Sequence, residues 1–322
     1  MVNIMDRQTK YICRLRFQNL IYASDAQAFE DLFVKIMNKS YPNFHSVKPQ
    51  GSYGDMKNDG YIGENGIYYQ VYGPENIEKS IFDARKKIEN DFTGLIKHWD
   101  GIKEFYFVVN DKYKGVGVKI HKELQELKSI LKKIGQDNSI KTDLIVPKDL
   151  ENLVLSLDVD TVFSIIGYLP ESVDGIDLDY AALTEVIKFI LKLPVSSGEN
   201  KLAVPDFNDK ILFNFATTDG KIMSSEVADR IKRHSENYGD IEIFFMNQGN
   251  LIRSELQKRF SELYSESKKI ILDDSDNYPD LRYMYMLEEC LPSEEKTLGN
   301  MVAVESLFSY FFETCDIFEE PK

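Results

Sequence analysis

The fold of the N-terminal half is decided by residues 54–72, which read GDMKNDGYIGENGIYYQVY. The first part of this stretch is rich in Gly, Asn and Asp, which favour turns, and it predicts a loop over 51–65. The second part, 66–72, is rich in tyrosine and β-branched residues and ends at Gly73-Pro74, which predicts a strand with a definite end. A polar loop therefore leads directly into a predicted strand.

Helices and strands alternate on both sides of this stretch. Apolar residues recur at helical spacing in three segments, and short β-rich runs separate them. The predicted helices cover 25–38, 76–98 and 117–134, and the further predicted strands cover 44–48, 104–110 and 142–146. The order α-β-β-α-β-α-β is typical of a small mixed sheet flanked by helices. The sequence therefore predicts an α/β domain.

The pattern changes near residue 150, where long helical stretches replace the alternation. Helices are predicted over 178–193, 222–237, 242–269 and 299–315. A chain of 322 residues is long enough for two domains. We predict an α/β domain over 1–149 and a mainly helical association domain over 150–322.

The charge is divided unevenly between these halves. Residues 1–150 carry 23 Lys and Arg against 20 Asp and Glu, a net charge of +3. Residues 151–322 carry 16 against 33, a net charge of −17, so the total is −14. Because phosphate binding depends on Lys and Arg, a nucleic-acid partner is expected only for the first half.

The cysteines and the hydropathy suggest an intracellular setting. Cys13, Cys290 and Cys315 are far apart in the sequence and have no close Cys or His, so neither a disulfide framework nor a zinc site is predicted. The chain shows neither an apolar signal segment nor an apolar run long enough to span a membrane. We expect a cytoplasmic protein without a membrane partner.

The densest chemical signal lies between residues 30 and 70. Asp55 and Asp59 stand just before the predicted strand that carries Gln70. A carboxylate beside an oxygen donor on a neighbouring strand is what Mg²⁺ or Mn²⁺ needs, with room left for water and a phosphate. Such a metal activates water and neutralises charge on phosphorus. The chemistry predicted is phosphodiester hydrolysis.

The same residues resemble the Mrr-like branch of the PD-(D/E)XK nuclease superfamily. The resemblance covers about 25–110 and rests on FEDL at 29–32, GD at 54–55, NDGY at 58–61 and YYQVY at 68–72. It implies a restriction-endonuclease-like fold and a Mg²⁺-dependent deoxyribonuclease. It further implies that Asp59 and Gln70 bind the metal together with the Val71 carbonyl, and that Glu30 is a helix carboxylate facing the site.

The sequence departs from the family pattern at one position. The family has a lysine two residues after the position of Gln70, whereas this chain has Tyr72, which carries no positive charge at neutral pH. Lys57 or a lysine of the 79–87 segment are candidates to replace it, because a lysine stem is long and flexible. A catalytically degenerate nuclease fold that binds nucleic acid or partner proteins without cleavage is the alternative.

The C-terminal half resembles the C-terminal domains of effectors in bacterial ABC three-component (ABC-3C) antiphage systems. The resemblance rests on DFNDKILFN at 206–214, EIFF at 242–245 and SYFFETCDIFEEP at 309–321. It implies two partners, an ABC-type ATPase and a small middle component. A homo-oligomer is also possible. The chain contains no Walker-type phosphate loop, so ATP hydrolysis would have to come from a partner.

Each of these residues also has a plainer interpretation. Asp55 and Asp59 can form Asx turns in a Gly-rich loop, and Glu30 can be a solvated helix carboxylate. The tyrosines near Gln70 suit strand packing better than base stacking. The phenylalanines of the last helix, Phe308, Phe311 and Phe312, together with Phe318, are expected to be mostly buried, with docking to a partner as the other possibility. A protein-only scaffold that uses the acidic half is a third interpretation.

Overall fold

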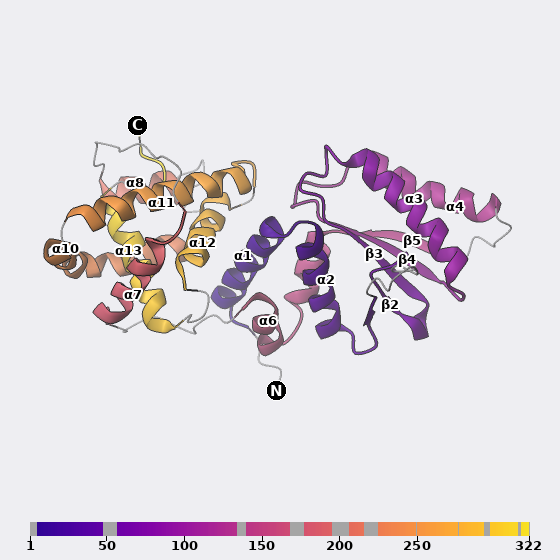
Figure 1. Ribbon diagram of the computed structural model, residues 1–322, viewed down its shortest axis with the longest axis horizontal. Coiled ribbons are helices and arrows are strands. Elements are labelled where there is room, and N and C mark those ends of the chain that lie inside the picture. Colours follow the sequence, from indigo (N-terminus) through magenta and orange to yellow (C-terminus); the bar gives the residue numbers. More distant parts are fainter. Residues whose placement is uncertain are drawn as a thin grey trace. The chain divides into compact units, whose positions relative to one another are not determined.

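We describe a computed structural model of the chain, which divides into two compact units, Met1–Tyr168 and Leu169–Lys322. Each unit is described by itself. The structure describes residues 5–47, 57–133, 140–167, 177–194, 206–215, 225–248, 250–275, 277–292, 297–314 and 317–321 (Figure 1).

Unit 1 is built on a mixed five-stranded sheet. Its strands are β1 (His45–Ser46), β2 (Gly60–Ile62), β3 (Ile67–Tyr72), β4 (Glu104–Val109) and β5 (Lys141–Ile145), in that spatial order. The first three strands pair antiparallel, whereas β3, β4 and β5 pair parallel. Tyr69 of β3 lies opposite Tyr106 of β4, and Gln70 lies opposite Phe107. This register fixes which side chains share each face of the sheet.

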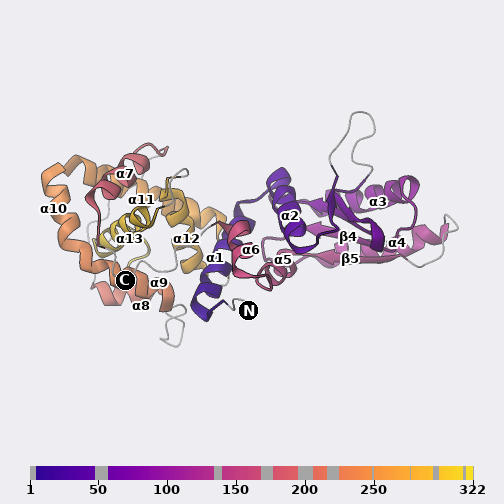
Figure 2. The same ribbon diagram turned by 90° about the horizontal axis from the view of Figure 1, so that it is seen from below.

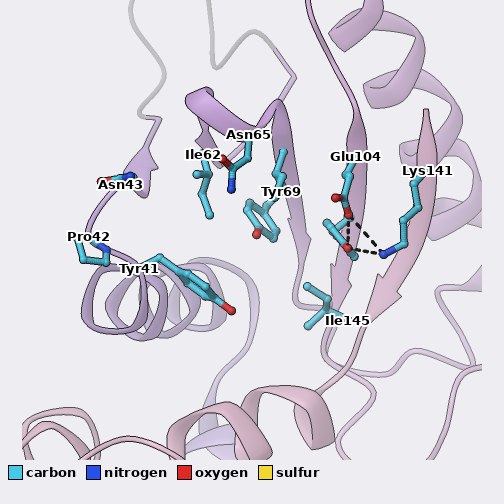
Figure 3. A pocket seen from close by; sticks show the side chains of 11 residues that line it. Tyr41, Pro42, Asn43, Ile62, Asn65, Tyr69, Glu104, Lys141 and Ile145 are labelled. Atoms are coloured by element: carbon cyan, nitrogen blue, oxygen red, sulfur yellow. Dashed lines mark hydrogen bonds and ion pairs between the residues drawn. The ribbon is translucent and has the colours of Figure 1, made fainter. Parts of the chain in front are cut away.

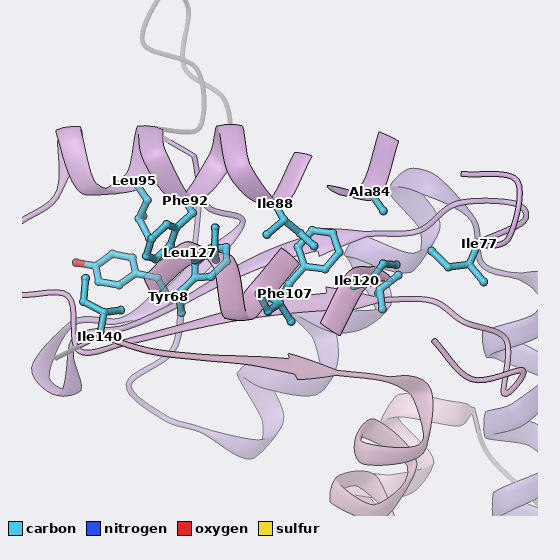
Figure 4. Close-up of a cluster of buried hydrophobic side chains, with 13 residues drawn as sticks. Tyr68, Ile77, Ala84, Ile88, Phe92, Leu95, Phe107, Ile120, Leu127 and Ile140 are labelled. Carbon is cyan, nitrogen blue, oxygen red and sulfur yellow. The ribbon is translucent and has the colours of Figure 1, made fainter. Parts of the chain in front are cut away.

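The hydrophobic core of unit 1 lies between the sheet and two long helices, α3 (Ile81–His98) and α4 (Val118–Lys133), which pack side by side. Apolar residues at helical spacing on α3 meet alternate residues of β3 and β4. The core residues include Tyr68, Ile88, Phe92, Leu95, Phe105, Phe107, Ile120 and Leu127 (Figure 4). The apolar periodicity of these segments thus specifies the face of the sheet that α3 and α4 cover.

The remaining helices of unit 1 pack together beside the sheet. They are α1 (Arg7–Ala23), α2 (Ala26–Ser40), α5 (Pro147–Val154) and α6 (Val159–Ile166). Glu151 of α5 is fully buried and holds α5 on α1 through contacts with Gln18 and Arg14. We predicted a boundary at residue 150, but because α5 and α6 pack on α1 and α2, the compact units divide after residue 168.

A tight turn joins β2 to β3 and sets the hairpin register. The short 3₁₀ helix η2 (Gly63–Asn65) ends at Gly66, whose φ of 66° lies in the left-handed region. A side chain at Gly66 would also place its Cβ 2.4 Å from the carbonyl oxygen of Gly101. Glycine is therefore required here for two independent reasons.

Unit 2 is helical throughout its described residues. Its helices are α7 (Tyr180–Ile190), α8 (Phe207–Phe215), α9 (Ser225–His234), α10 (Tyr238–Gln248), α11 (Asn250–Ile270), α12 (Tyr278–Cys290) and α13 (Leu298–Glu313), with η3 (Ser235–Asn237) between α9 and α10. Helix α13 contacts α7, α9, α10 and α12 and is surrounded by them (Figure 2). The expected burial of Phe308, Phe311, Phe312 and Phe318 is confirmed, so these rings are not a surface for a partner.

A charged cluster lies inside unit 2. Glu305 of α13 is fully buried, and its two carboxylate oxygens lie 2.7 Å from an Arg230 guanidinium nitrogen and 2.8 Å from His234 Nε2. Arg230 also donates a hydrogen bond of 2.9 Å to Glu226. We name these four residues the Glu305 cluster. It ties α9 to α13 through paired charges.

The prediction of a small mixed sheet followed by a mainly helical half is confirmed, although several details differ. Strand β2 lies within the predicted loop over 51–65, and α1, α5, α6, α8 and α12 were not predicted. The predicted helix over 242–269 is two helices, α10 and α11. In the described part of the chain, no helix is long and apolar enough to cross a membrane.

Candidate functional site

Asp59 stands immediately before β2, at the edge of β3. Its backbone N–H donates to the carbonyl oxygen of Tyr69 at 2.9 Å, and its own carbonyl accepts from the Val47 N–H at 3.1 Å. Because Gly60 pairs with Tyr69 in the antiparallel hairpin, the preceding residue, Asp59, lies across from Gln70. The hairpin register therefore brings together two residues that are eleven positions apart.

The Asp59 carboxylate is buried and accepts two hydrogen bonds on one oxygen. Gln70 Nε2 and the backbone N–H of Val71 each donate to Asp59 Oδ2 at 2.6 Å. The pairing of β2 with β3 ends at Tyr69. The Asp59 carboxylate therefore accepts the Val71 N–H hydrogen bond that a longer β2 strand would accept. Asp59 is 6% exposed and Gln70 is 1% exposed. Asp59, Gln70 and Val71, three residues that the sequence analysis assigned to the metal, are thus in contact.

Two amides beside this contact have unmet hydrogen-bonding capacity. Among the described residues, neither Gln70 Oε1 nor the side-chain nitrogen and oxygen of Asn58 has a hydrogen-bond partner, although all three atoms are buried. A buried polar group without a partner costs about 1–3 kcal/mol, so such groups are rare and call for an explanation. We name Asn58, Asp59, Gln70 and Val71 the Asp59 site.

If a divalent cation binds at the Asp59 site, few protein oxygens would hold it. The described residues contain no group of three or more His, Cys, Asp or Glu side chains that could hold a metal, so a site rich in carboxylates is absent there. The oxygens of this contact are the Asp59 carboxylate and the unpartnered Gln70 Oε1, whereas Val71 makes its contact through its N–H. Mg²⁺ commonly takes few protein oxygens and several waters. The unpartnered amide atoms would then bond to those waters.

Lys57 lies close to the site in sequence but is paired elsewhere. Its φ of 68° is in the left-handed region, which is strained for a residue with a side chain. Its ammonium lies 3.3 Å from Asp91 of α3, and Lys87 pairs with the same carboxylate at 2.9 Å. Gly94 leaves room for the lysine stem, since a Cβ there would lie 2.5 Å from Lys57 Cγ.

Glu30 and Tyr72 complete the predicted set. Glu30 is half-buried on α2, and α2 packs against β3, but the described contacts do not join Glu30 to Asp59 or Gln70. Tyr72 ends β3 and packs its ring 6.0 Å from Phe107. Asp55 lies outside the described residues.

Sequence reasoning did not single out Asn58. The residue stands in the quoted NDGY segment, but nothing in the sequence distinguishes a buried asparagine from one in a turn. Only the structure reveals that this amide is fully buried and without a partner among the described residues.

The fold and the site define a two-unit protein with a mixed-sheet unit, which carries a buried Asp–Gln contact at a strand edge, and a helical unit. Residues 181–319 match the family of C-terminal domain 10 of the ABC-three component (ABC-3C) systems. This match covers nearly all of the described helical unit and confirms that the C-terminal half resembles a C-terminal domain of ABC-3C systems. Neither the curated proteins nor the solved structures give a match to the chain.

Proposed function

We propose that this protein is the Mg²⁺-dependent DNA endonuclease effector of a bacterial ABC-3C antiphage system. The C-terminal domain match supports membership of such a system. The observation that carries the nuclease assignment is the hairpin contact of Asp59 with Gln70 and Val71. In the resembling Mrr-like family, these three positions hold the metal.

The residues have distinct roles in this proposal. The Asp59 carboxylate supplies the charge that holds Mg²⁺ or Mn²⁺, while Gln70 presents Oε1 in place of the N–H that it now directs at Asp59. Bound there, the metal would activate water and neutralise charge on the phosphate. Glu30 supports the site from α2, and Lys57, released from Asp91, supplies the cation that Tyr72 lacks.

The proposed partners are DNA, an ABC-type ATPase and a small middle component. DNA is assigned to unit 1 because residues 151–322 carry a net charge of −17. Unit 2 exposes three apolar side chains at the junction of α10 and α11, where Ile243 is 53%, Met246 71% and Leu251 72% exposed. Exposed apolar residues in one region are typical of a protein–protein contact surface. A homo-oligomer through the same helices is a further possibility.

Two observations favour a second candidate, a degenerate nuclease fold that binds nucleic acid or proteins without cleavage. Tyr72 occupies the position of the family lysine, and Lys57 is held in an ion pair with Asp91. This candidate predicts a DNA mobility shift that weakens with salt and is never followed by cleavage when Mg²⁺ is added.

Metal binding can be measured without the activating partner. We expect Mn²⁺ to raise the melting temperature of the wild type by roughly 5–10 °C at about 100 times its dissociation constant, because it stabilises only the folded state. Asp59→Asn retains a hydrogen-bond acceptor for Gln70 and Val71 but removes the charge, so its melting temperature should not respond to Mn²⁺. The matched control is Asp143→Asn on β5, an exposed aspartate that also accepts a backbone hydrogen bond.

The outcomes separate the candidates. A response in the wild type and in Asp143→Asn, but not in Asp59→Asn, supports a metal at the Asp59 site. Equal responses in all three proteins, or none in any, contradict this assignment and favour the degenerate fold.

A further inference from the structure

A pocket of about 530 Å³ lies on the face of the sheet opposite to Gln70. Side chains alternate along a strand, so Tyr69 and Gln70 of β3 point to opposite faces. The pocket is lined by residues of β2, β3, β4 and β5 and by Tyr41-Pro42-Asn43 at the end of α2 (Figure 3). We name it the tyrosine pocket. Its volume is in the range of sites that bind small molecules.

Aromatic rings form much of the pocket wall. The rings of Tyr69 and Tyr106 lie nearly parallel, at an interplanar angle of 18° with centroids 5.6 Å apart. Tyr41 approaches from the end of α2 and remains 40% exposed (Figure 3). A flat aromatic ligand can stack on such rings with a gain of about 1–3 kcal/mol per base. The wall therefore favours a planar ligand.

One side of the pocket is polar and consists of three residues that contact one another, Glu104, Tyr106 and Lys141. Tyr106 donates its hydroxyl hydrogen to Glu104 Oε2 at 2.5 Å, and Lys141 Nζ donates to the Tyr106 oxygen at 2.8 Å. Lys141 also lies 3.4 Å from Glu104 Oε2. The tyrosine hydrogen bond, aided by Lys141, lowers the pKa of Glu104 below its usual range. The carboxylate is thus ionised and held in place beside an ammonium.

We propose that the tyrosine pocket binds the guanine base of a small nucleoside ligand. Guanine presents two adjacent N–H donors, N1–H and the 2-amino group, beside the acceptor O6. A fixed carboxylate is complementary to the two donors, and both protein contacts of Glu104 use Oε2, so accepting capacity remains on the other oxygen. Lys141 is complementary to O6. Adenine offers no such donor pair next to an acceptor.

The charges of the pocket favour a free nucleoside or nucleotide over a nucleic-acid strand. Among the described residues that line the pocket, Glu104 and Lys141 are the charged ones, and their charges cancel. A polynucleotide would require a track of cations along its phosphates. The tyrosine pocket is also independent of the proposed nuclease site, since it uses other residues on the other face of the sheet.

The test is a calorimetric titration of the full chain with guanosine, inosine and adenosine. Inosine lacks only the 2-amino group, so it should bind at least about tenfold more weakly than guanosine, because one hydrogen bond to a charged group is lost. Guanosine binding should also fall at least about tenfold in Glu104→Gln and in Tyr41→Ala. The matched control is Glu126→Gln, an exposed glutamate on α4, which should bind guanosine like the wild type. A parallel titration with guanosine monophosphate tests whether the pocket binds a nucleotide more tightly than a nucleoside.

Several results would overturn the proposal. These are the absence of guanosine binding at several millimolar by a normally melting wild type, equal affinities for guanosine, inosine and adenosine, and unchanged guanosine binding in a folded Glu104→Gln variant. A guanine-rich single strand that binds more tightly than guanosine, and depends on Glu104, would instead assign the pocket to nucleic acid.

Discussion

The Asp59 site and the Glu305 cluster are both buried polar groups, but their carboxylates have different partners: a guanidinium in the Glu305 cluster, and amide N–H groups in the Asp59 site. In the Glu305 cluster, opposite charges meet at hydrogen-bond distance, with Arg230 between Glu226 and Glu305. In the Asp59 site, the carboxylate is satisfied, whereas the Asn58 amide and Gln70 Oε1 have no partner among the described residues.

This difference distinguishes polar groups that hold a fold together from those that are available to a ligand. Removal of one partner from a buried ion pair leaves the other charge buried and uncompensated, which is strongly destabilising. Unpartnered amides lower stability, and proteins tend to retain such groups where a function needs them. We therefore expect substitutions in the two clusters to have opposite consequences.

The largest effect is expected for Glu305→Gln. Loss of the carboxylate charge leaves the Arg230 guanidinium with a weaker partner inside the helical unit, so the free energy of unfolding should fall by about 3–5 kcal/mol. Urea denaturation followed by far-UV circular dichroism measures this loss. The control is Glu255→Gln on α11, an exposed glutamate whose substitution should change stability by less than about 0.5 kcal/mol. A loss below about 1 kcal/mol in Glu305→Gln would contradict a stabilising role.

Acid should also remove the stabilisation that the Glu305 carboxylate provides. The loss of unfolding free energy in acid should not exceed the loss caused by Glu305→Gln. Burial acts to raise the pKa of Glu305, but Arg230 and His234 outweigh it and hold the pKa below the ordinary value of 4.5. The folded state therefore binds fewer protons there than the unfolded state. The stabilisation is fully present above pH 4.5 and is lost as the pH falls through the folded-state pKa.

The comparison with Glu305→Gln isolates this group from the other carboxylates. The stability difference between the wild type and Glu305→Gln should shrink as the pH falls below 4.5. Urea denaturation of both proteins between pH 7 and pH 3 measures it. A difference that stays unchanged down to pH 3 would contradict the loss of this stabilisation in acid.

Local patterns in the sequence predict most of unit 1. The β3 and β4 segments are apolar runs that end at turn residues, and α3 carries its apolar residues at helical spacing. Strand β2 has only three residues and gains its structure from pairing with β3, which no local pattern reveals. The segment predicted as one helix over 242–269 is two helices, α10 and α11, because its apolar periodicity does not mark where one helix ends and the next begins.

In the candidate site, the sequence predicts the contact between neighbouring strands but not the contacts between distant segments. Asp59 and Gln70 flank one short hairpin, so their contact follows from the strand and the loop before it. The ion pair of Lys57 with Asp91 and the contact of Glu104 with Lys141 join residues more than thirty positions apart. Burial, which makes Asn58 notable, depends on the packed unit and not on the neighbouring residues.

The smallest effect on stability is expected for Asn58→Ala. The substitution removes a fully buried amide that has no hydrogen-bond partner among the described residues, and this gain offsets the loss of packing. The free energy of unfolding should therefore change by less than about 1 kcal/mol, and an increase is an acceptable outcome.

The same variant tests whether that amide serves the site. If Asn58 bonds to the waters of a cation at Asp59, the Mn²⁺-dependent rise in melting temperature should be smaller in Asn58→Ala than in the wild type, although the metal-free proteins melt alike. The neighbouring change Gly63→Ala, in η2 of the same hairpin, is the control, because a Cβ there meets only the Tyr61 ring at 3.2 Å. A large loss of stability in Asn58→Ala with an unchanged Mn²⁺ response would make Asn58 a structural residue like Glu305, and the contrast between the two clusters would then disappear.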